Sequence, residues 1–274
     1  MSERLAVRKT YKLFIGGKFP RSESGRSYLV QESNVALASR KDARDAVLAA
    51  RAAVKGWSGA TAYNRGQILY RVAEMLEGRR DQFVGLGLTV AEVDEAIDRW
   101  VWYAGWADKV AQVYGGANPV AGPYFNLSAS EPTGVVGVVA PADSALLGLV
   151  SVIAPAIVTG NTVVVLAAEE LPLAAVTLAE VLATSDLPGG VVNILTGRAA
   201  ETAPWLASHL DVNAIDLTGV TDPTLAVELE QAAAGNLKRV LRPAATPVDW
   251  TADPGLARIT AFLETKTVWH PKGV

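Results

Sequence analysis

The sequence contains no cysteine, and this absence restricts the chemistry that the chain can perform. Disulfides, thiolate metal sites and a cysteine nucleophile are all excluded within these 274 residues. Histidine is also scarce, with His209 and His270 the only two, so a histidine-rich metal site is not expected. The composition would allow a Ser–His–Asp triad, but no spacing of these residues supports one. P-loop, HExxH and GxSxG motifs are missing as well.

An excess of charge of one sign is also lacking. The chain has 25 Lys and Arg residues against 28 Asp and Glu, a net charge of −3, and its basic residues are scattered. This pattern gives no electrostatic footprint for nucleic acid or for a membrane surface. The N-terminal stretch MSERLAVRKTYKLFIGG has no apolar leader region, so we expect a cytoplasmic protein.

One stretch without charge, from Ser144 to Ala168, is long enough to span a bilayer. Pro155, Gly160 and Asn161 interrupt it, however, and β-branched residues crowd one half. A buried helix followed by a buried parallel strand explains the stretch better than a membrane span does. We therefore expect no membrane partner.

The first part of the chain predicts short strands and then helices. KLFIGGKF and SYLVQES read as strands, and the Gly16-Gly17 pair suits a hairpin turn. Helical patterns follow at 39–57, where Ser39 or Asp42 is the expected cap, then at 62–80 and 91–116. In the last of these, Trp102 and Trp106 share one face with Tyr103 beside them, which indicates core packing.

After residue 130 strands and helices alternate five times with short connections. The strands are expected at 134–141, 161–167, 190–195, 213–219 and 236–241, and the helices between them at 145–158, 172–184, 200–208 and 224–234. This alternation predicts an α/β fold with a doubly wound, parallel, Rossmann-like sheet covered on both faces. Ligands of such sheets bind beyond the C-terminal ends of the strands.

The C-terminal part differs from this alternating unit. A short helix around 255–264 leads into ETKTVWH, where polar and apolar residues alternate as in an exposed or edge strand. The sequence offers this strand no obvious partner. We divide the chain into an N-terminal part of strands and helices (1–117), a hairpin (118–132), the Rossmann-like core (133–243), and a linker with a terminal strand (244–274).

Several segments resemble one known family in order and spacing. They are EPTGVVGVVAP (131–141), IAPAIVTGNTVVV (153–165), LPGGVVNILTG (187–197), LASHLDVNAIDLTGVTD (206–222) and GNLKRV (235–240). Together they resemble the dinucleotide-binding half of the aldehyde dehydrogenase superfamily. KLFIGGKF and LETKTVW resemble that family's first strand and its oligomerisation strand. The family's catalytic domain, which lies between the fifth strand and the tail, is missing, so the chain is identified as a truncated and degenerate member.

The resemblance also implies which family positions have lost their chemistry. The family's nucleophile is a cysteine of the missing domain, and its general-base glutamate matches Pro243, with Ala245 and Thr246 at the glycines that follow. The family's oxyanion-binding Asn matches Asp143, and an ionised Asp only accepts hydrogen bonds. Proline also ends a strand, because it has no N–H for the ladder. No catalytic residue is therefore expected.

The positions that would hold a dinucleotide are also altered. Leu166 replaces the family's lysine and Val220 its serine, whereas Glu169 and Gly219 remain as vestigial cofactor-binding candidates. Gly219 is equally explained by a turn, and Glu169 by a solvated place near a helix N-terminus. We therefore expect no cofactor, with weak binding of NAD or NADP as the alternative.

The sequence thus predicts a non-catalytic, aldehyde-dehydrogenase-like pseudoenzyme. It would act as an oligomerisation, scaffold or regulatory subunit of a full-length aldehyde dehydrogenase, through an interface formed by Leu263, Thr265, Thr267 and Trp269. The tail could instead fold back on its own hairpin at 118–131 and support a homo-oligomer. Two further alternatives are an NAD(P)-binding module or sensor, and NAD-dependent aldehyde oxidation completed by a partner subunit.

Overall fold

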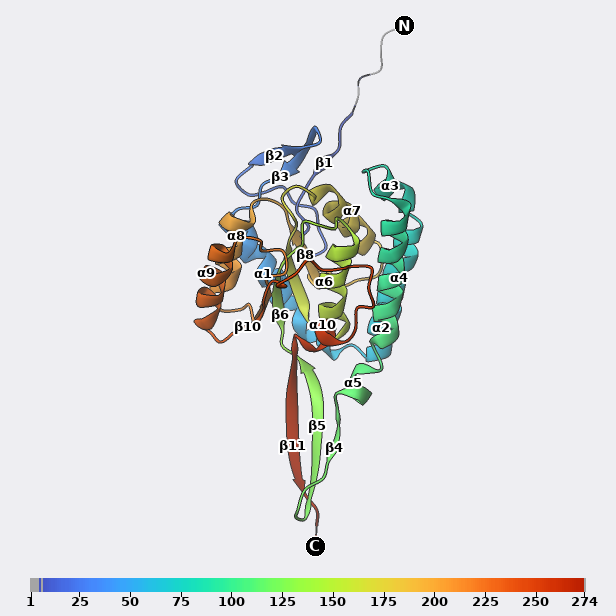
Figure 1. The fold of residues 1–274 in the computed structure, drawn as a ribbon, viewed down its shortest axis with the longest axis vertical. Helices are drawn as coiled ribbons and strands as arrows, with labels where there is room; N and C mark the ends of the chain where they lie inside the picture. Colours follow the sequence, from blue (N-terminus) through green and yellow to red (C-terminus); the bar gives the residue numbers. More distant parts are fainter. Residues whose placement is uncertain (1–4, 6, 274) are drawn as a thin grey trace.

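A parallel sheet of five strands forms the centre of the molecule (Figure 1). The computed structural model describes residue 5 and residues 7–273. Residues 1–4, on which part of the argument against a leader rests, lie outside the described residues. The strands have the order β10-β9-β6-β7-β8, and they are β6 (Val135–Val139), β7 (Thr162–Leu166), β8 (Val192–Leu195), β9 (Ala214–Asp216) and β10 (Arg239–Leu241). The predicted α/β, doubly wound fold is confirmed.

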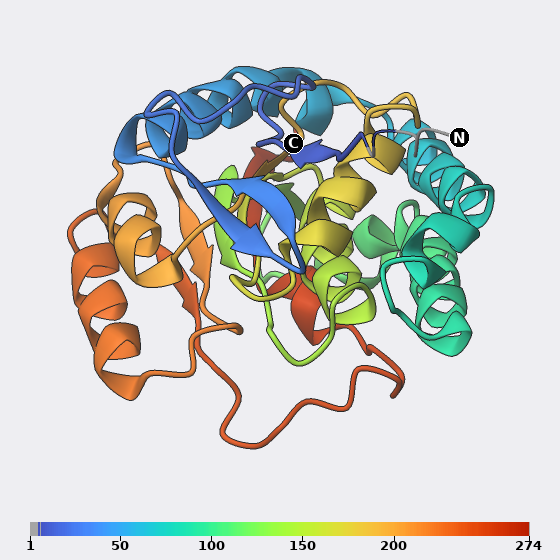
Figure 2. The same ribbon diagram turned by 90° about the horizontal axis from the view of Figure 1, so that it is seen from above.

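Helices cover both faces of this sheet, which is why its central strands are apolar throughout (Figure 2). Alternate residues face opposite sides: Val136 and Val138 join one hydrophobic cluster, while Val135 and Val139 join the other. The first face packs against α6 (Leu147–Val158) and α7 (Pro172–Leu182), and α2 (Ala62–Glu77) and α4 (Val90–Trp106) form an outer layer that extends the same hydrophobic cluster. The second packs against α1 (Arg40–Gly59), α8 (Ala199–Ser208) and α9 (Pro223–Ala234).

The N-terminal segment contributes a small sheet of its own, with the order β1-β3-β2. Its strands are β1 (Thr10–Tyr11), β2 (Ser27–Val30) and β3 (Ser33–Ala36). The predicted turn at Gly16-Gly17 is confirmed: Ile15 and Lys18 exchange two backbone hydrogen bonds of 2.9 and 3.0 Å, and both glycines have positive φ. Ser39 caps α1, and Asp42 bonds back to the backbone N–H of Ser39.

The helix expected at 91–116 is in fact two helices. α4 ends at Trp106, and the short α5 (Val110–Val113) follows it, as α3 (Arg80–Val84) follows α2. Trp100 and Tyr103 are fully buried in the core, whereas Trp102 and Trp106 contact each other and are only half-buried. The aromatic residues of α4 therefore pack in the core as predicted, but Trp100 and Tyr103, rather than Trp102 and Trp106, lie at the centre of its buried face.

A three-stranded antiparallel arm projects from the globular body in Figure 1. Its strands are β4 (Gly116–Asn118), β5 (Tyr124–Pro132) and β11 (Leu263–Pro271), in the order β11-β5-β4. β11 pairs with β5 along all nine of its residues. The expectation that this strand has no partner in the chain is wrong: the tail folds back on the chain's own hairpin, which was the alternative interpretation.

The arm and the sheet are linked at two places. β5 runs almost directly into β6, so the parallel strands begin beside the arm and their C-terminal ends lie at the opposite edge. Residues 242–262, including α10 (Ala257–Thr260), lead from that far edge back to the base of the arm. Within the described part of the chain, no helix has the length and apolarity needed to cross a bilayer.

Candidate functional site

A cleft of about 750 Å³ lies at the C-terminal ends of β6, β9 and β10. The loops after these strands form its walls together with residues 243–250 of the connection to the arm. Three of the predicted positions, Asp143, Gly219 and Pro243, line it together. The remaining one, Glu169, is not among the residues that line it.

Pro243 lies two residues beyond the end of β10 and opens a segment of small apolar residues. β10 stops at Leu241, and Arg242 is held by Glu230 of α9 at 2.8 Å. Residues 243–248, of sequence PAATPV, then form one wall of the cleft. Thr246 carries the one polar side chain of this segment, so the wall that follows β10 offers no general base.

The close packing of two backbones requires glycine at position 219. Its backbone N–H donates to the carbonyl of Val139 at 3.0 Å, which brings the turn after β9 against the end of β6. A Cβ on Gly219 would lie 2.0 Å from the carbonyl oxygen of Ala140. Only glycine fits this close approach of two backbones. The survival of Gly219 is thus explained without a ligand.

Asp143 lies in the loop after β6, and its carboxylate is exposed. Its Oδ1 accepts a hydrogen bond of 2.9 Å from the indole N–H of Trp250. Among the described residues that line the cleft, Asp143 is the only one with an ionisable side chain. A carboxylate here repels a developing oxyanion, because it adds negative charge where a hydrogen-bond donor is needed.

Trp250 is the residue of this site that the sequence did not reveal. It is buried, and it packs against Gly148 in the first turn of α6, where an added Cβ would lie 3.2 Å from the indole. Arg99 of α4 donates to the backbone carbonyls of Trp250 and Ala252, at 2.7 and 3.0 Å. The guanidinium of Arg258 lies 5.4 Å from the indole ring centre.

Arg258 also anchors the connection between β10 and β11, residues 242–262, to the sheet. It pairs at 3.0 Å with Asp216, a fully buried carboxylate at the end of β9, and donates to the hydroxyl of Thr218. The signals for this anchor were Asp216 inside an apolar strand and Arg99 beside the buried face of α4. Neither signal identifies its partner, because both partners lie far away in the sequence, in residues 242–262.

Glu169 lies after β7 in a separate environment. Its carboxylate forms an exposed ion pair with Arg198 at 3.4 Å, and its carbonyl accepts a hydrogen bond from the hydroxyl of Tyr28. Burial, reinforced by the Glu169 carboxylate, raises the pKa of Tyr28 to about 12. The hydroxyl of Tyr28 therefore stays protonated at neutral pH.

The side chains that line the cleft include no cation that could pair with a diphosphate. A diphosphate needs N–H donors or cations around it. The cleft instead offers Asp143, three threonines and walls of alanine, proline and valine. The carboxylate of Glu169, a candidate for a ribose, is already paired with Arg198 and lies outside the cleft.

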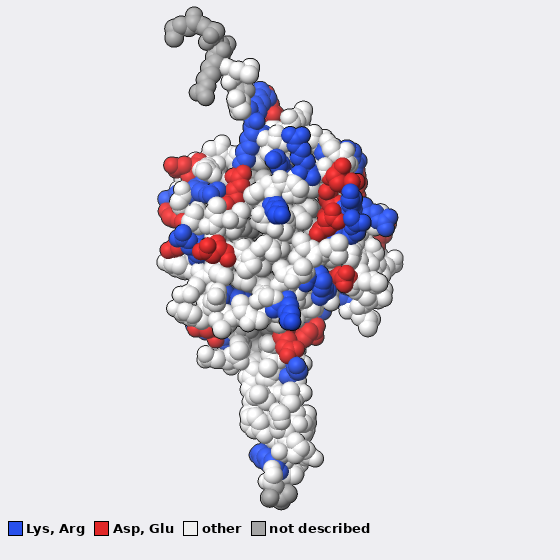
Figure 3. All heavy atoms as spheres, turned by 180° about the vertical axis from the view of Figure 1, so that it is seen from behind, with Lys and Arg blue, Asp and Glu red and all other residues white. Residues whose placement is uncertain are grey.

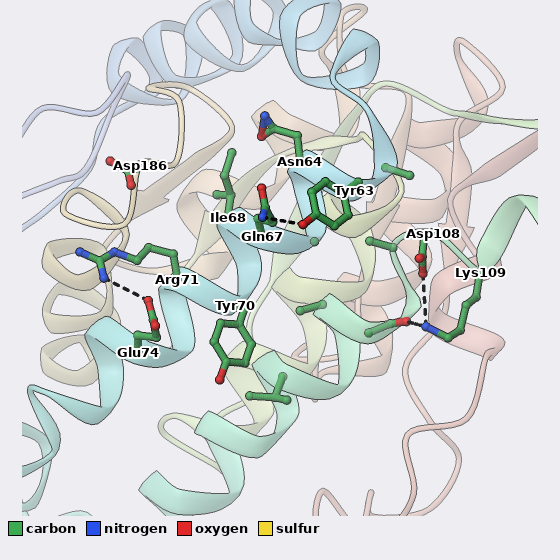
Figure 4. A pocket seen from close by; sticks show the side chains of 16 residues that line it. Tyr63, Asn64, Gln67, Ile68, Tyr70, Arg71, Glu74, Asp108, Lys109 and Asp186 are labelled. Carbon is green, nitrogen blue, oxygen red and sulfur yellow. Dashed lines mark hydrogen bonds and ion pairs between the residues drawn. The ribbon is translucent and has the colours of Figure 1, made fainter.

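A second hollow, of about 630 Å³, lies between α2 and α4 (Figure 4). Its polar side chains largely satisfy one another: Gln67 donates to Tyr63, and Arg71 pairs with Glu74. Lys109 is likewise engaged with its neighbour Asp108. Nothing in this groove suggests chemistry, and the described residues contain no cluster of side chains fit to hold a metal ion.

The predicted interface residues alternate along β11 and share one face of the arm. Leu263 lies opposite Pro132 at the base, and Trp269 lies opposite Asn126 near the tip. Trp269 is 57% exposed and contacts Tyr124 edge-on. Thr265 and Thr267 lie between them, and both are exposed.

Comparison with known proteins gives a consistent result. Residues 30–242 match the model of the aldehyde dehydrogenase family. The chain is 35% identical to human (Homo sapiens) retinal dehydrogenase 2 and 34% identical to cytosolic aldehyde dehydrogenase 1 of Elephantulus edwardii. These alignments cover 85% and 84% of this chain, but 48% and 49% of the two relatives. The chain therefore spans about half the length of the curated relatives it matches.

Solved structures agree. The NAD+ complex of an aldehyde dehydrogenase from Bacillus cereus superposes with a TM-score of 0.78 at 25% identity, and HpcC from Thermus thermophilus with 0.79 at 30%. Each superposition covers 85% of this chain, and 50% and 47% of the two known chains.

Proposed function

This chain belongs to the aldehyde dehydrogenase family, and we propose that it is a non-catalytic member, a pseudoenzyme that serves as an oligomerisation, scaffold or regulatory subunit of a full-length aldehyde dehydrogenase. One observation carries the proposal. Residues 242–262 lead from the end of the parallel sheet directly to the arm, and they cover the strand ends with Trp250. The arm keeps its three strands, while the cleft at the opposite end of the sheet is lined by no side chain that we would assign to catalysis.

The chemistry of the strand ends supports this proposal. The sequence has no cysteine, Pro243 follows β10, and Asp143 places a carboxylate in the cleft. Nucleophile, general base and oxyanion donor are the three groups that aldehyde oxidation through a covalent intermediate requires. Purified chain incubated with an aldehyde and NAD should give no reduced cofactor above a blank. Its formation would contradict the proposal.

We propose further that the chain works without a cofactor. The mismatch between the cleft and a diphosphate supports this, although relatives have been solved with NAD bound. Calorimetric titration with NAD and with NADP tests it. No heat at millimolar nucleotide is expected, and saturable binding would favour the alternative of a dinucleotide-binding module or sensor.

The arm is the surface by which the chain would assemble with its partner. β11 is an edge strand of the arm, and an edge strand can take a strand from another chain. The proposed partner is a full-length aldehyde dehydrogenase of the same cell. The proposed compartment is the cytoplasm, in keeping with the cytosolic relative.

Co-expression with a full-length relative from the same organism, followed by size-exclusion chromatography, tests this role. The chain should co-elute with that relative, and Trp269→Asp should weaken co-elution by placing a charge on the interface face. Leu29→Asp is the matched control, because Leu29 is exposed on β2, at the end of the body opposite the arm (Figure 1). If the wild-type chain does not co-elute, and Trp269→Asp behaves in the same way, the scaffold role is wrong.

A further inference from the structure

The outer side of β11 carries a row of backbone groups that the chain itself does not use. At the two ends of the β5–β11 ladder, Thr133 N donates to Phe262 O and Lys272 N donates to Pro123 O. In an antiparallel ladder, alternate residues direct both backbone groups to the same neighbour. The even-numbered residues of β11 therefore direct their backbone N–H and C=O groups towards β5. The odd-numbered ones direct their C=O groups and, except for Pro271, their N–H groups outward, where no strand of the described chain pairs with them.

β11 lacks most of the features that usually protect an edge strand. Such strands are commonly short, bulged, or guarded by a free charge or a proline, and β11 has a proline only at its last residue, Pro271. β11 pairs over nine residues in unbroken register, and the ammonium of Lys266 is engaged by Glu131 at 3.0 Å. Glu264 is likewise held by Arg239 at 2.6 Å. Figure 3 shows the arm almost free of charge between its base and its tip.

We propose that a second copy of this chain pairs with β11, edge to edge and antiparallel, to form a continuous six-stranded sheet. The geometry points to one register. β11 runs from the body to the tip of the arm, so in an antiparallel pair each tip approaches the other body (Figure 1). Full overlap without collision places the two-fold axis at Thr267, the central residue of β11.

This register makes use of the exposed side chains. Thr267 lies opposite Thr267 of the second copy, and Thr265 lies opposite its Trp269. Thr267 already contacts Ser128 at 2.9 Å, and Ser128 accepts from Asn118 at 2.8 Å. The ladder of polar side chains thereby continues across the axis. The exposed indole of Trp269 is covered by Thr265 of the second copy at the same time.

A second copy suits this edge because the edge is complementary to itself. Outward residues of one β11 meet outward residues of the other in every pair of this register. The charges of Glu264 and Lys266 are internally compensated, so the two arms do not repel each other. A single strand pair buries little area, so the dimer should be weak, in the range of roughly micromolar dissociation constants.

This inference rests on the role of the arm in the proposed function and deepens it. A homodimer would occupy the edge that a full-length partner needs. The two associations therefore exclude each other, and added full-length relative should convert homodimer into mixed assembly.

Site-directed crosslinking tests the register. Because the chain has no native cysteine, only the introduced thiols can form a disulfide. Across the axis, Thr267→Cys places two thiols at a Cα separation of about 5.5 Å, which a disulfide can span. Thr265→Cys on the same face places its thiols several residues apart and is the matched control. Under mild oxidation Thr267→Cys should become a covalent dimer, while Thr265→Cys stays monomeric. Equal crosslinking of both variants, or of neither, would overturn the register.

Sedimentation of the whole wild-type chain tests the dimer without any substitution. The apparent mass should rise from 28.8 kDa towards twice that value over roughly 1–200 µM. Thr267→Pro removes one outward N–H and should abolish this rise, whereas Thr267→Val, which keeps that N–H, should retain it. A wild-type chain that stays at 28.8 kDa throughout would sink the inference. If that monomer still co-elutes with a full-length relative, the proposed function stands while the homodimer falls.

Discussion

The indole N–H of Trp250 donates a hydrogen bond of 2.9 Å to Oδ1 of Asp143. This bond joins the connection between β10 and β11 to the loop after β6, at the edge of the sheet where α/β proteins usually bind their ligands. Trp250 is buried there between α6 and Arg258. The chain therefore covers part of its own strand ends.

Replacing Trp250 by alanine should be strongly destabilising. The change leaves a cavity against Gly148 and removes the partner of Asp143, so the free energy of unfolding should fall by about 3 kcal/mol. Urea unfolding followed by circular dichroism measures it. Trp205→Ala is the matched control, because Trp205 is 40% exposed on α8, and it should cost less. Equal losses in the two variants would mean that Trp250 does not anchor the connection.

The buried pair of Asp216 and Arg258 should behave asymmetrically. Arg258→Met leaves the fully buried carboxylate of Asp216 without its cation and should cost about 3 kcal/mol. Adding Asp216→Leu removes that uncompensated charge and should restore part of the stability. A double variant less stable than Arg258→Met would contradict a role for charge compensation at this site.

Gly219→Ala should destabilise the chain even though no ligand is involved. The new methyl would meet the carbonyl of Ala140, so a loss of about 2 kcal/mol or more is expected in urea unfolding. Gly56→Ala is the matched control, because Gly56 is exposed inside α1 with open space around it, and it should gain about 0.5–1 kcal/mol. A harmless Gly219→Ala would remove the packing explanation for this glycine.

The Arg239–Glu264 pair should make the base of the arm sensitive to acid. The hydrogen-bonded guanidinium of Arg239 holds the pKa of Glu264 below its ordinary value. A carboxyl whose pKa is lower in the folded state stabilises the fold above its unfolded pKa. That stabilisation is lost as the pH falls through the lower, folded value.

Glu264→Gln should therefore lower the urea midpoint at pH 7 and lower it less at about pH 3. The effect at pH 7 should stay below about 1 kcal/mol, because both partners are roughly half exposed. The exposed Glu228 of α9 supplies the control Glu228→Gln, which should match the wild type at both pH values. A Glu264→Gln deficit of equal size at both would show that charge is not its cause.

The sequence predicts the parallel sheet well because each buried strand is a continuous apolar run between turn signals. Val135–Val139 and Thr162–Leu166 are buried throughout and leave little room for another interpretation. The N-terminal turn at Gly16-Gly17 could be predicted equally well, since the positive φ angles of such a turn favour glycine.

The site is less predictable, because its anchors depend on long-range contacts. Residues 242–256 have no periodicity, so nothing in the sequence pairs Trp250 with Asp143 or Arg258 with Asp216. The choice between the two interpretations of β11 stayed open for the same reason: an alternating pattern identifies a strand and its faces, but not its neighbour. The four candidate positions follow neighbouring strands, yet Glu169 lies apart because the loop after β7 turns towards Arg198.

Native mass spectrometry is the sharpest test of whether this chain assembles with a full-length family member. The two proteins are co-expressed and purified through a tag on the full-length one. We expect complexes whose masses include whole multiples of the 28.8 kDa chain, and their loss with Trp269→Asp but not with Leu29→Asp. Spectra that contain the full-length protein alone, with this chain present and folded in the same cells, would contradict it.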